Sequence, residues 1–187
     1  MIKAERTGKE FTPAPEGAHS AVCVDVVDLG MVETTWKDET TKKHKIRVVF
    51  QIEETDVDND DKRFAVMAWF VLSMHPKSNL RKFLESWRGK KYKDDDEAWD
   101  TDVESMIGVP ALIQIVHRTS NDRTFANIDS IMKVPKSMPK IKPDEDYIRV
   151  KDREDTPAPA ANDDHIDESY DEMPEALDES DESPLPF

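Results

Sequence analysis

Apolar and polar residues alternate over five separate stretches of this 187-residue chain, and one helical stretch lies between the third and the fourth. Alternation with a period of two is typical of a strand with one buried face, whereas a period near 3.6 is typical of an amphipathic helix. The predicted strands cover residues 18–36, 44–54, 63–72, 109–117 and 123–134. This order restricts the chain to a mainly β fold with a helical insert.

The first predicted strand contains a glycine that should bend it. Val22, Val24 and Val26 share one face, and β-branched residues favour a pleated strand. Gly30 then interrupts the pattern, as glycine does where a strand bends sharply, and the strand continues over 31–36. We expect the polar run WKDETTKK at 36–43 to form a connection to the second strand.

The helical insert carries its own start and stop residues. Its apolar residues recur at i, i+3, i+4 and i+7, namely Leu80, Phe83, Leu84 and Trp87. Ser78 is a suitable N-cap, and Gly89 suits the position after the last helical residue. A second short helix is predicted over 101–108, where Thr101 and Glu104 have the spacing of a capping box.

Three strands, a helical insert and two strands, with a bent first strand, are the element order of an OB-fold, a five-stranded barrel. The alternative is an open α+β sheet. We predict an OB-fold domain at 18–143, preceded by an extended arm at 1–17.

Charge divides the chain into two parts. The net charge is −15, yet residues 154–187 hold thirteen Asp and Glu and no Lys or Arg, which leaves 28 acidic and 26 basic residues before them. A segment so poor in apolar residues cannot offset its ordering entropy, so we predict that 144–187 forms a disordered acidic tail. Cys23 is the only cysteine, which excludes an intrachain disulfide. With neither a membrane-spanning run nor a signal-peptide core, we expect a cytoplasmic protein.

Patterns typical of enzymes are missing from the sequence. There is no glycine-rich phosphate loop, no nucleophile elbow and no His-Glu-x-x-His. The run DVDNDD at 56–61 lacks the glycine and the distal Glu of a calcium loop, so a solvated turn is favoured. The run KDDDEAWD at 93–100 is expected to be an acidic loop ahead of a helix N-terminus. We therefore predict no catalytic residues, no metal and no cofactor.

Basic and aromatic residues instead gather around the predicted strands two and three and the neighbouring loops, which are the oligonucleotide-binding region of an OB-fold. Single-strand binding without sequence preference needs cations along the backbone and rings on which bases stack. For any one Lys a solvated surface position remains the simpler explanation. The candidate nucleic-acid-binding residues are Trp36, Lys37, Lys43, Lys45, Arg47, Arg63, Trp69, Lys82, Arg88, Lys90, Lys91, Tyr92, Arg118, Arg123 and Phe125.

Trp36 and Trp69 are the preferred stacking residues. Trp69 falls on the strand face opposite Phe70, which alternates with aliphatic residues and is expected in the core. Phe83 and Trp87 are also expected in the core, because they lie on the apolar stripe of the helix.

The sequence ends in SDESPLPF, an acidic run followed by two apolar anchors. Prolines hold such a terminus extended, and a basic partner can bind the terminal carboxylate. The predicted partner-binding tip consists of Asp181, Glu182, Pro184, Leu185, Pro186 and Phe187.

An OB-like body, an acidic segment and an acidic–Pro–Phe terminus resemble the single-stranded DNA-binding proteins (SSB) of bacteria and their phages. Leu185 stands where the SSB tip commonly has Ile. The runs PKSNLRKFLESWRGKKY and LIQIVHRTSNDRTFANI resemble phage-encoded SSB-like proteins, and this resemblance covers about residues 10–135. It implies sequence-independent binding of single-stranded DNA in the bacterial host cell, support of replication, recombination and repair, and recruitment of replication or repair proteins through the tip.

Two alternatives stay open. An acidic adaptor or DNA mimic would bind a DNA-processing protein without binding single-stranded DNA, and a metal-dependent nuclease would use the Asp-rich loops. The oligomeric state, a homodimer included, and the choice between DNA and RNA are not determined by the sequence.

Overall fold

The computed structural model describes residues 12–36, 39–120 and 123–153. Its centre is a five-stranded antiparallel sheet in the order β3-β2-β1-β4-β5. The strands are β1 (Gly17–Trp36), β2 (Glu39–Asp56), β3 (Lys62–Val71), β4 (Pro110–Ser120) and β5 (Arg123–Met132). Helices α1 (Asn79–Arg88) and α2 (Asp95–Trp99) and the 3₁₀ turn η2 (Val103–Met106) lie between β3 and β4. The predicted mainly β fold with a helical insert at this place is confirmed.

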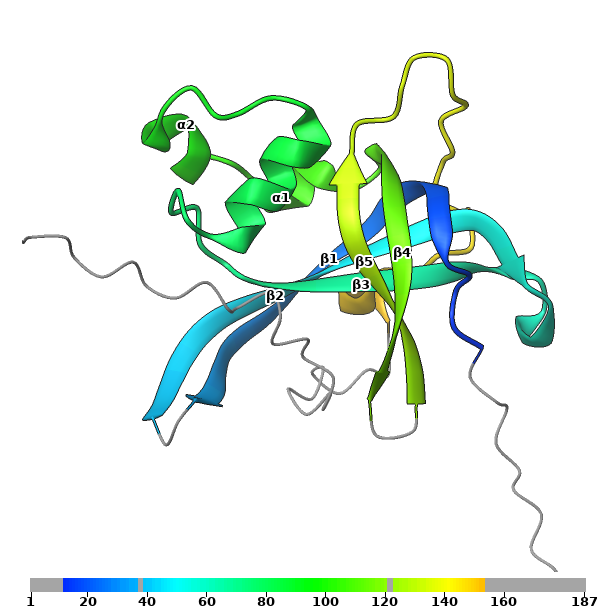
Figure 1. Cartoon of the computed structure of the whole chain (residues 1–187), viewed down its shortest axis with the longest axis horizontal. Coiled ribbons are helices and arrows are strands. Elements are labelled where there is room, and N and C mark those ends of the chain that lie inside the picture. The colour runs from blue at the N-terminus through cyan, green and yellow to red at the C-terminus, as the bar shows by residue number, and fades with distance from the viewer. Residues whose placement is uncertain (1–11, 37–38, 121–122, 154–187) are drawn as a thin grey trace, which may run out of the picture.

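Closure of the sheet into a barrel is not detected in the described part of the chain. β3 and β5 form its two edges, and within the described residues they do not pair with each other. Figure 1 shows β4 and β5 running across β1, β2 and β3 at a steep angle, so the sheet is strongly coiled. The residues of β3 and β5 approach one another as a result.

The bend in β1 is confirmed. The pairing of β1 with β2 shifts register between Asp28 and Gly30, and Gly30 has a φ of 67°, a left-handed conformation that glycine adopts without a Cβ penalty. The predicted connection over 36–43 is wrong, because β2 already begins at Glu39. Threonines pair across this part of the hairpin, Thr34 with Thr41, and β-branched threonine suits a strand although it is polar.

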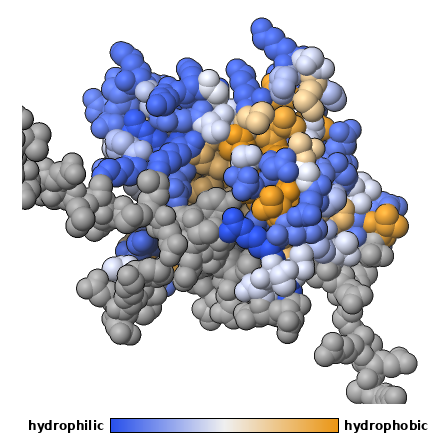
Figure 2. Space-filling view, viewed as in Figure 1, coloured by the Kyte–Doolittle hydropathy of each residue, from blue (hydrophilic) through white to orange (hydrophobic). Residues whose placement is uncertain are grey.

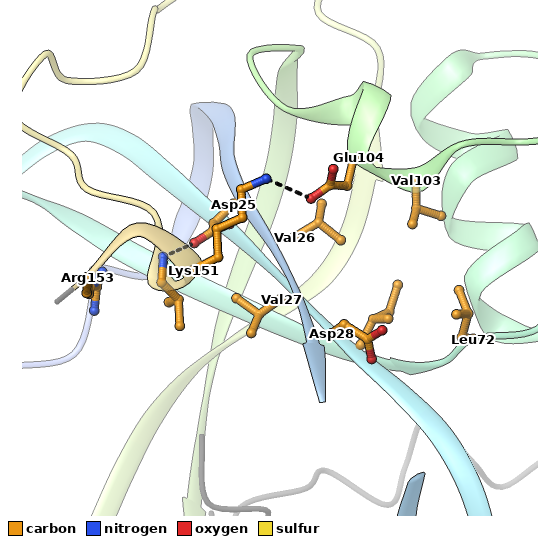
Figure 3. Close-up of a pocket in the computed structure, with 11 residues that line it drawn as sticks. Asp25, Val26, Val27, Asp28, Leu72, Val103, Glu104, Lys151 and Arg153 are labelled. Carbon is orange, nitrogen blue, oxygen red and sulfur yellow. Dashed lines mark hydrogen bonds and ion pairs between the residues drawn. The ribbon is translucent and has the colours of Figure 1, made fainter. Parts of the chain in front are cut away.

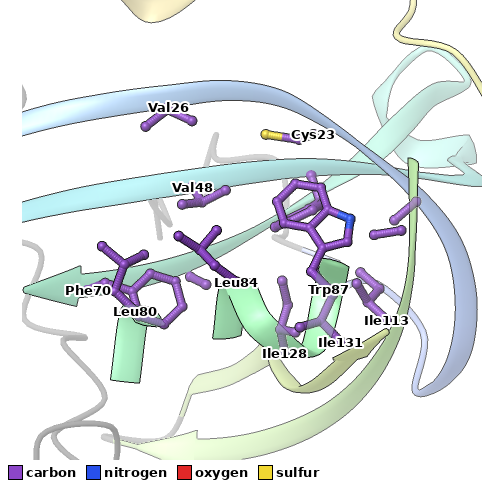
Figure 4. Close-up of a cluster of buried hydrophobic side chains, with 14 of the residues drawn as sticks. Cys23, Val26, Val48, Phe70, Leu80, Leu84, Trp87, Ile113, Ile128 and Ile131 are labelled. Atoms are coloured by element: carbon purple, nitrogen blue, oxygen red, sulfur yellow. The ribbon is translucent and has the colours of Figure 1, made fainter. Parts of the chain in front are cut away.

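The core lies between the inner face of the sheet and α1 (Figure 4). Trp87 is 3% exposed, its ring centroid lies 5.2 Å from that of Phe50, and its Nε1 donates to the carbonyl of Pro110 at 3.0 Å. Cys23 is fully buried in the same cluster, and burial raises the pKa of its thiol to about 12. The predicted core positions of Phe70 and Trp87 are confirmed, and Phe83 packs partly buried against them.

The caps of α1 are those predicted. The Ser78 side chain accepts from the N–H of Arg81, and Gly89 follows the helix with a φ of 68°. The second predicted short helix is present in its range as the 3₁₀ turn η2 and not as an α-helix, and its cap is Asp102 and not the predicted Thr101. The acidic run ahead of it forms α2, with the Asp94 carboxylate accepting from the N–H of Glu97. A short Asp-rich helix is difficult to distinguish from a loop in the sequence, because Asp is favoured both at helix N-caps and in turns.

Residues 141–153, which we call the strap, pack across the face of the sheet opposite the core. Tyr147 and Ile141 pack on a second apolar cluster, Val22, Val24 and Val49. The carboxylate of Asp25, only 1% exposed, accepts from the Arg149 guanidinium at 3.1 Å and from the Val150 N–H at 2.7 Å. Most of the strap lies in the range predicted as tail, so the packed part of the chain extends at least to residue 153.

Candidate nucleic-acid interface

Two hairpins project from the body on the side away from α1 and α2 (Figure 1). The pairing of β3 with β2 ends at Lys45, so β1 and β2 continue beyond this point as a two-stranded ribbon. The pairing of β1 with β4 ends at Ile115, so β4 and β5 form a second ribbon. We call these two ribbons the arms. Their side chains are not required to fill the hydrophobic core.

Near the base of the first arm, Arg47 and Trp69 are directly opposite each other on β2 and β3. Directly paired side chains of an antiparallel ladder share one face, and here it is the face opposite the core. Trp69 is partly buried. The Nε of Arg47 is buried and has no hydrogen-bond partner in the described part of the chain. A ring and a guanidinium therefore lie side by side, on the same face of the sheet as Tyr147 of the strap.

The second arm repeats the combination. Arg118 on β4 pairs directly with Phe125 on β5, both partly buried. Arg123 is exposed at the start of β5. The segment before β1 holds the base of this arm. The His117 ring is hydrogen-bonded to the carbonyl of Ala14 at 2.7 Å, and the backbone N–H of His117 donates to the Glu16 carboxylate.

The predicted cations of the first arm differ among themselves. Lys43 is partly exposed, whereas Lys45 is only 2% exposed. Lys37 and the side chain of Trp36 lie outside the described residues. His44 bonds Asp28 at 2.6 Å, and the N–H of Gly30 together with His44 lowers the pKa of that carboxyl.

Five predicted residues lie in the helical insert, on the opposite side of the body from the arms. Figure 2 shows hydrophilic side chains over α1 and α2. Arg88 is engaged internally, with Nη2 2.8 Å from the Glu97 carboxylate and its guanidinium carbon 4.1 Å from the ring centroid of Tyr92. Arg88 lowers the pKa of Glu97, and Tyr92 is only 7% exposed. No base reaches that ring without displacing Arg88, whereas Lys82, Lys90 and Lys91 are exposed.

Arg63 is held by the strap. Its Nη1 donates to the carbonyl of Lys142 at 2.8 Å, and its Nε lies 3.2 Å from the carboxylate of Asp144. The same carboxylate accepts from the side-chain amide of Gln51. The structure thus brings Arg47 together with Trp69 and Arg118 together with Phe125, and places the insert residues elsewhere.

Sequence reasoning missed a pocket beside β1, about 460 Å³ in volume, between η2 and the 3₁₀ turn η3 (Val150–Asp152). Figure 3 shows apolar side chains such as Val27 and Leu72 on its walls, with Lys151 reaching Glu104 across the opening at 3.5 Å. One feature of the sequence could have indicated this region. Asp25 is a single acid within a run of valines, and a buried carboxylate needs a partner from another part of the chain.

The predicted tip residues Asp181, Glu182, Pro184, Leu185, Pro186 and Phe187 lie outside the described residues. Among the residues that are described, no group of three His, Cys, Asp or Glu side chains is placed to hold a metal ion. In the same residues, no helix has the length and apolar character needed to cross a membrane.

Comparison with protein-family models finds no match for this chain, and comparison with the sequences of curated proteins finds none either.

Proposed function

We propose that the protein binds single-stranded DNA without sequence preference, on an OB-type body, and supports DNA replication, recombination and repair. The observation that carries the proposal is the direct pairing of a cation with a ring at two places, Arg47 with Trp69 near the base of the first arm and Arg118 with Phe125 on the second arm. The resemblance to phage-encoded SSB-like proteins points to the same activity.

The geometry suggests how such binding works. Guanidinium groups neutralise phosphates and release counterions, so affinity falls steeply with salt. Bases stack on the neighbouring rings, and each stack contributes about 1–3 kcal/mol for any base, because every base has a π-face. Binding of this type reads no sequence, since neither interaction depends on the edge of the base.

The experiment is a titration of the protein with oligo(dT) at two salt concentrations, followed by tryptophan fluorescence. Quenching at low salt that weakens at high salt supports both the stacking and the phosphate contacts. An absence of binding at low salt contradicts the proposal. Loss of the oligonucleotide with Mg²⁺ present would instead indicate the nuclease.

We further propose that the C-terminal tip recruits replication or repair proteins, and that the acidic tail competes with DNA for the cations. A tethered tail acts at an effective concentration near the mM range. Deletion of 154–187 should therefore tighten binding of oligo(dT), and one glycine added after Phe187 should weaken partner capture only. An unchanged DNA affinity after the deletion contradicts the competition.

An acidic adaptor is the second candidate, favoured by the net charge of −15. It predicts that a basic DNA-processing protein binds the chain while oligo(dT) does not. Gel shift at low salt separates the two candidates. Size-exclusion chromatography with light scattering tests whether the chain forms a homodimer.

A further inference from the structure

A second cationic surface lies on the side of the molecule away from the arms. Residues 133–142, the yellow loop that follows β5 in Figure 1, contain four lysines and no Asp or Glu. We call this segment the basic loop. Its lysines are Lys133, Lys136, Lys140 and Lys142, and all four are exposed.

The basic loop is held in place by its apolar residues. Val134 is 6% exposed, and Ile141 packs against the second apolar cluster beneath the strap. Between them, the N–H of Met138 donates to the carbonyl of Pro135 at 3.0 Å and closes a turn. With the ends anchored and proline restricting the backbone, less entropy is lost when a ligand binds the lysines.

Two lysines of the insert join this surface. A Cβ added at Gly89 would lie 3.7 Å from the Cβ of Lys133, so the end of α1 touches the start of the basic loop. Lys90 and Lys91 follow Gly89 directly and are exposed. We define the basic patch as Lys90, Lys91, Lys133, Lys136 and Lys140.

The basic patch has uncompensated charge. Within the described residues, no ion pair involves any of the five side chains, whereas Arg63, Arg81, Arg88 and Arg149 all contact carboxylates. Glu97 is hydrogen-bonded by Arg88 and by the Lys93 N–H, and the positive charge of Lys90 acts on it only without an ion pair. A group of exposed lysines that form no ion pairs within the described residues favours a polyanion through its charge.

We infer that the basic patch is a second phosphate-binding surface, which holds the same DNA strand beyond the arms. This inference rests on the proposed function. Each lysine ammonium is a point charge on a flexible side chain, and the basic patch contains no aromatic ring and no guanidinium. Such a surface suits backbone phosphates rather than bases. A short oligonucleotide bound at the arms does not reach the patch, and a longer one does.

The test compares two double variants that remove the same charge. Lys133→Gln with Lys136→Gln changes the basic patch. Lys62→Gln with Lys77→Gln changes two exposed lysines at the start of β3 and before α1. Binding of dT oligomers of about 8 and about 30 nucleotides is measured over a range of salt, since one OB-fold covers roughly 4–16 nucleotides.

We expect the patch variant to lose affinity for the long oligomer, on the order of tenfold at low salt, and to lower the slope of log K against log salt by about 0.7 per lost contact. Its binding of the short oligomer stays unchanged, and the control variant leaves both oligomers unchanged. Circular dichroism and thermal melting verify that both variants fold.

An unchanged slope in the patch variant, or equal losses in both variants, overturns the inference while the proposed function stands. Failure of the unmodified protein to bind either oligomer overturns both. A patch variant that loses affinity for poly-glutamate and keeps the long oligomer assigns the surface to an acidic protein segment, which also overturns the inference.

Discussion

The arginines of the helical insert and those at the two arms have opposite surroundings. The insert has seven basic residues within 77–93, yet Arg81 contacts Glu85 and Asp95, and Arg88 contacts Glu97. Near the base of the first arm and on the second arm, Arg47 and Arg118 each lie opposite an aromatic residue on the neighbouring strand. Density of charge along the chain is therefore not sufficient to identify a binding surface, because Arg81 and Arg88 contact carboxylates while Lys90 and Lys91 stay exposed. The position of the nearest carboxylates in space decides whether a cation is available to a ligand.

Two tryptophans of the insert differ in burial, and the largest expected effect on stability is at the buried Trp87. Trp87→Ala should lower the free energy of unfolding by about 3–5 kcal/mol, because it empties the contact between α1 and the sheet. Denaturant unfolding measures the change. Trp99→Ala is the control, since this side chain is 58% exposed on α2 and should shift stability by less than about 0.5 kcal/mol. Similar losses in both variants would contradict the packing of the insert.

The strap should depend on Asp25 to a smaller extent. Asp25→Ala leaves the Val150 N–H and one donor of Arg149 without their acceptor, which costs about 1.5–3 kcal/mol for a buried hydrogen bond to a charged group. Hydrogen exchange should show faster exchange at the Val150 amide in particular. Asp146→Ala is the matched control, because Asp146 is exposed on the same segment. Unchanged exchange at Val150 would mean that the strap is held by Tyr147 and its apolar contacts alone.

Bases should stack on Trp69, near the base of the first arm, and not on the exposed tryptophan of the insert. Trp69→Ala is expected to weaken oligo(dT) binding by about 1–3 kcal/mol, the value of one base stacked on an aromatic ring. Trp99→Ala removes an exposed tryptophan from the insert and should leave the affinity unchanged. Fluorescence anisotropy with a labelled oligonucleotide measures both. A greater loss for Trp99 than for Trp69 would move the interface to the insert.

Arginine variants test the same contrast through salt dependence. Arg47→Gln should lower the slope of log K against log salt by about 0.7, the value for one phosphate contact on a single strand. Arg88→Gln should leave the slope unchanged, because its guanidinium already contacts Glu97 and Tyr92. Equal changes in slope would show that the ion pair of Arg88 opens when DNA binds.

Local features of the fold were predictable, and tertiary contacts were not. Ser78 and Gly89 mark the ends of α1 because caps depend on residues next to them in sequence. The bend at Gly30 has the same local origin. The burial of Tyr92 could not be predicted, since it depends on Arg88 being held over the ring by an acid nine residues further on.

The ribbon of the first arm and the strap were missed for a related reason. Lys42 and Thr41 are polar, so this part of β2 shows no apolar alternation, although backbone pairing alone sustains a ribbon. Residues 144–153 have the composition of a tail. They are nevertheless held on the sheet by the packing of Tyr147 and by hydrogen bonds to the buried side chains of Asp25 and Gln51. For the candidate site, strand alternation placed Trp69 on the face opposite Phe70, whereas its pairing with Arg47 depends on the register between β2 and β3. The internal use of Arg63 did not, because Asp144 is 81 residues away in the chain.

The smallest effect concerns acid stability at the base of the first arm. The pKa of Asp28 is lowered in the folded protein by the Gly30 N–H and by His44, so the unfolded state binds this proton more readily. The contribution is present above the unfolded pKa, near 4, and is lost as the pH falls through the lower, folded value. It should amount to at most about 1 kcal/mol, because the side chain is exposed. Asp28→Ala should therefore melt closer to the unmodified protein at pH 3 than at pH 6 in thermal scans. An equal difference at both pH values would mean that the carboxylate does nothing for the bend beyond its packing.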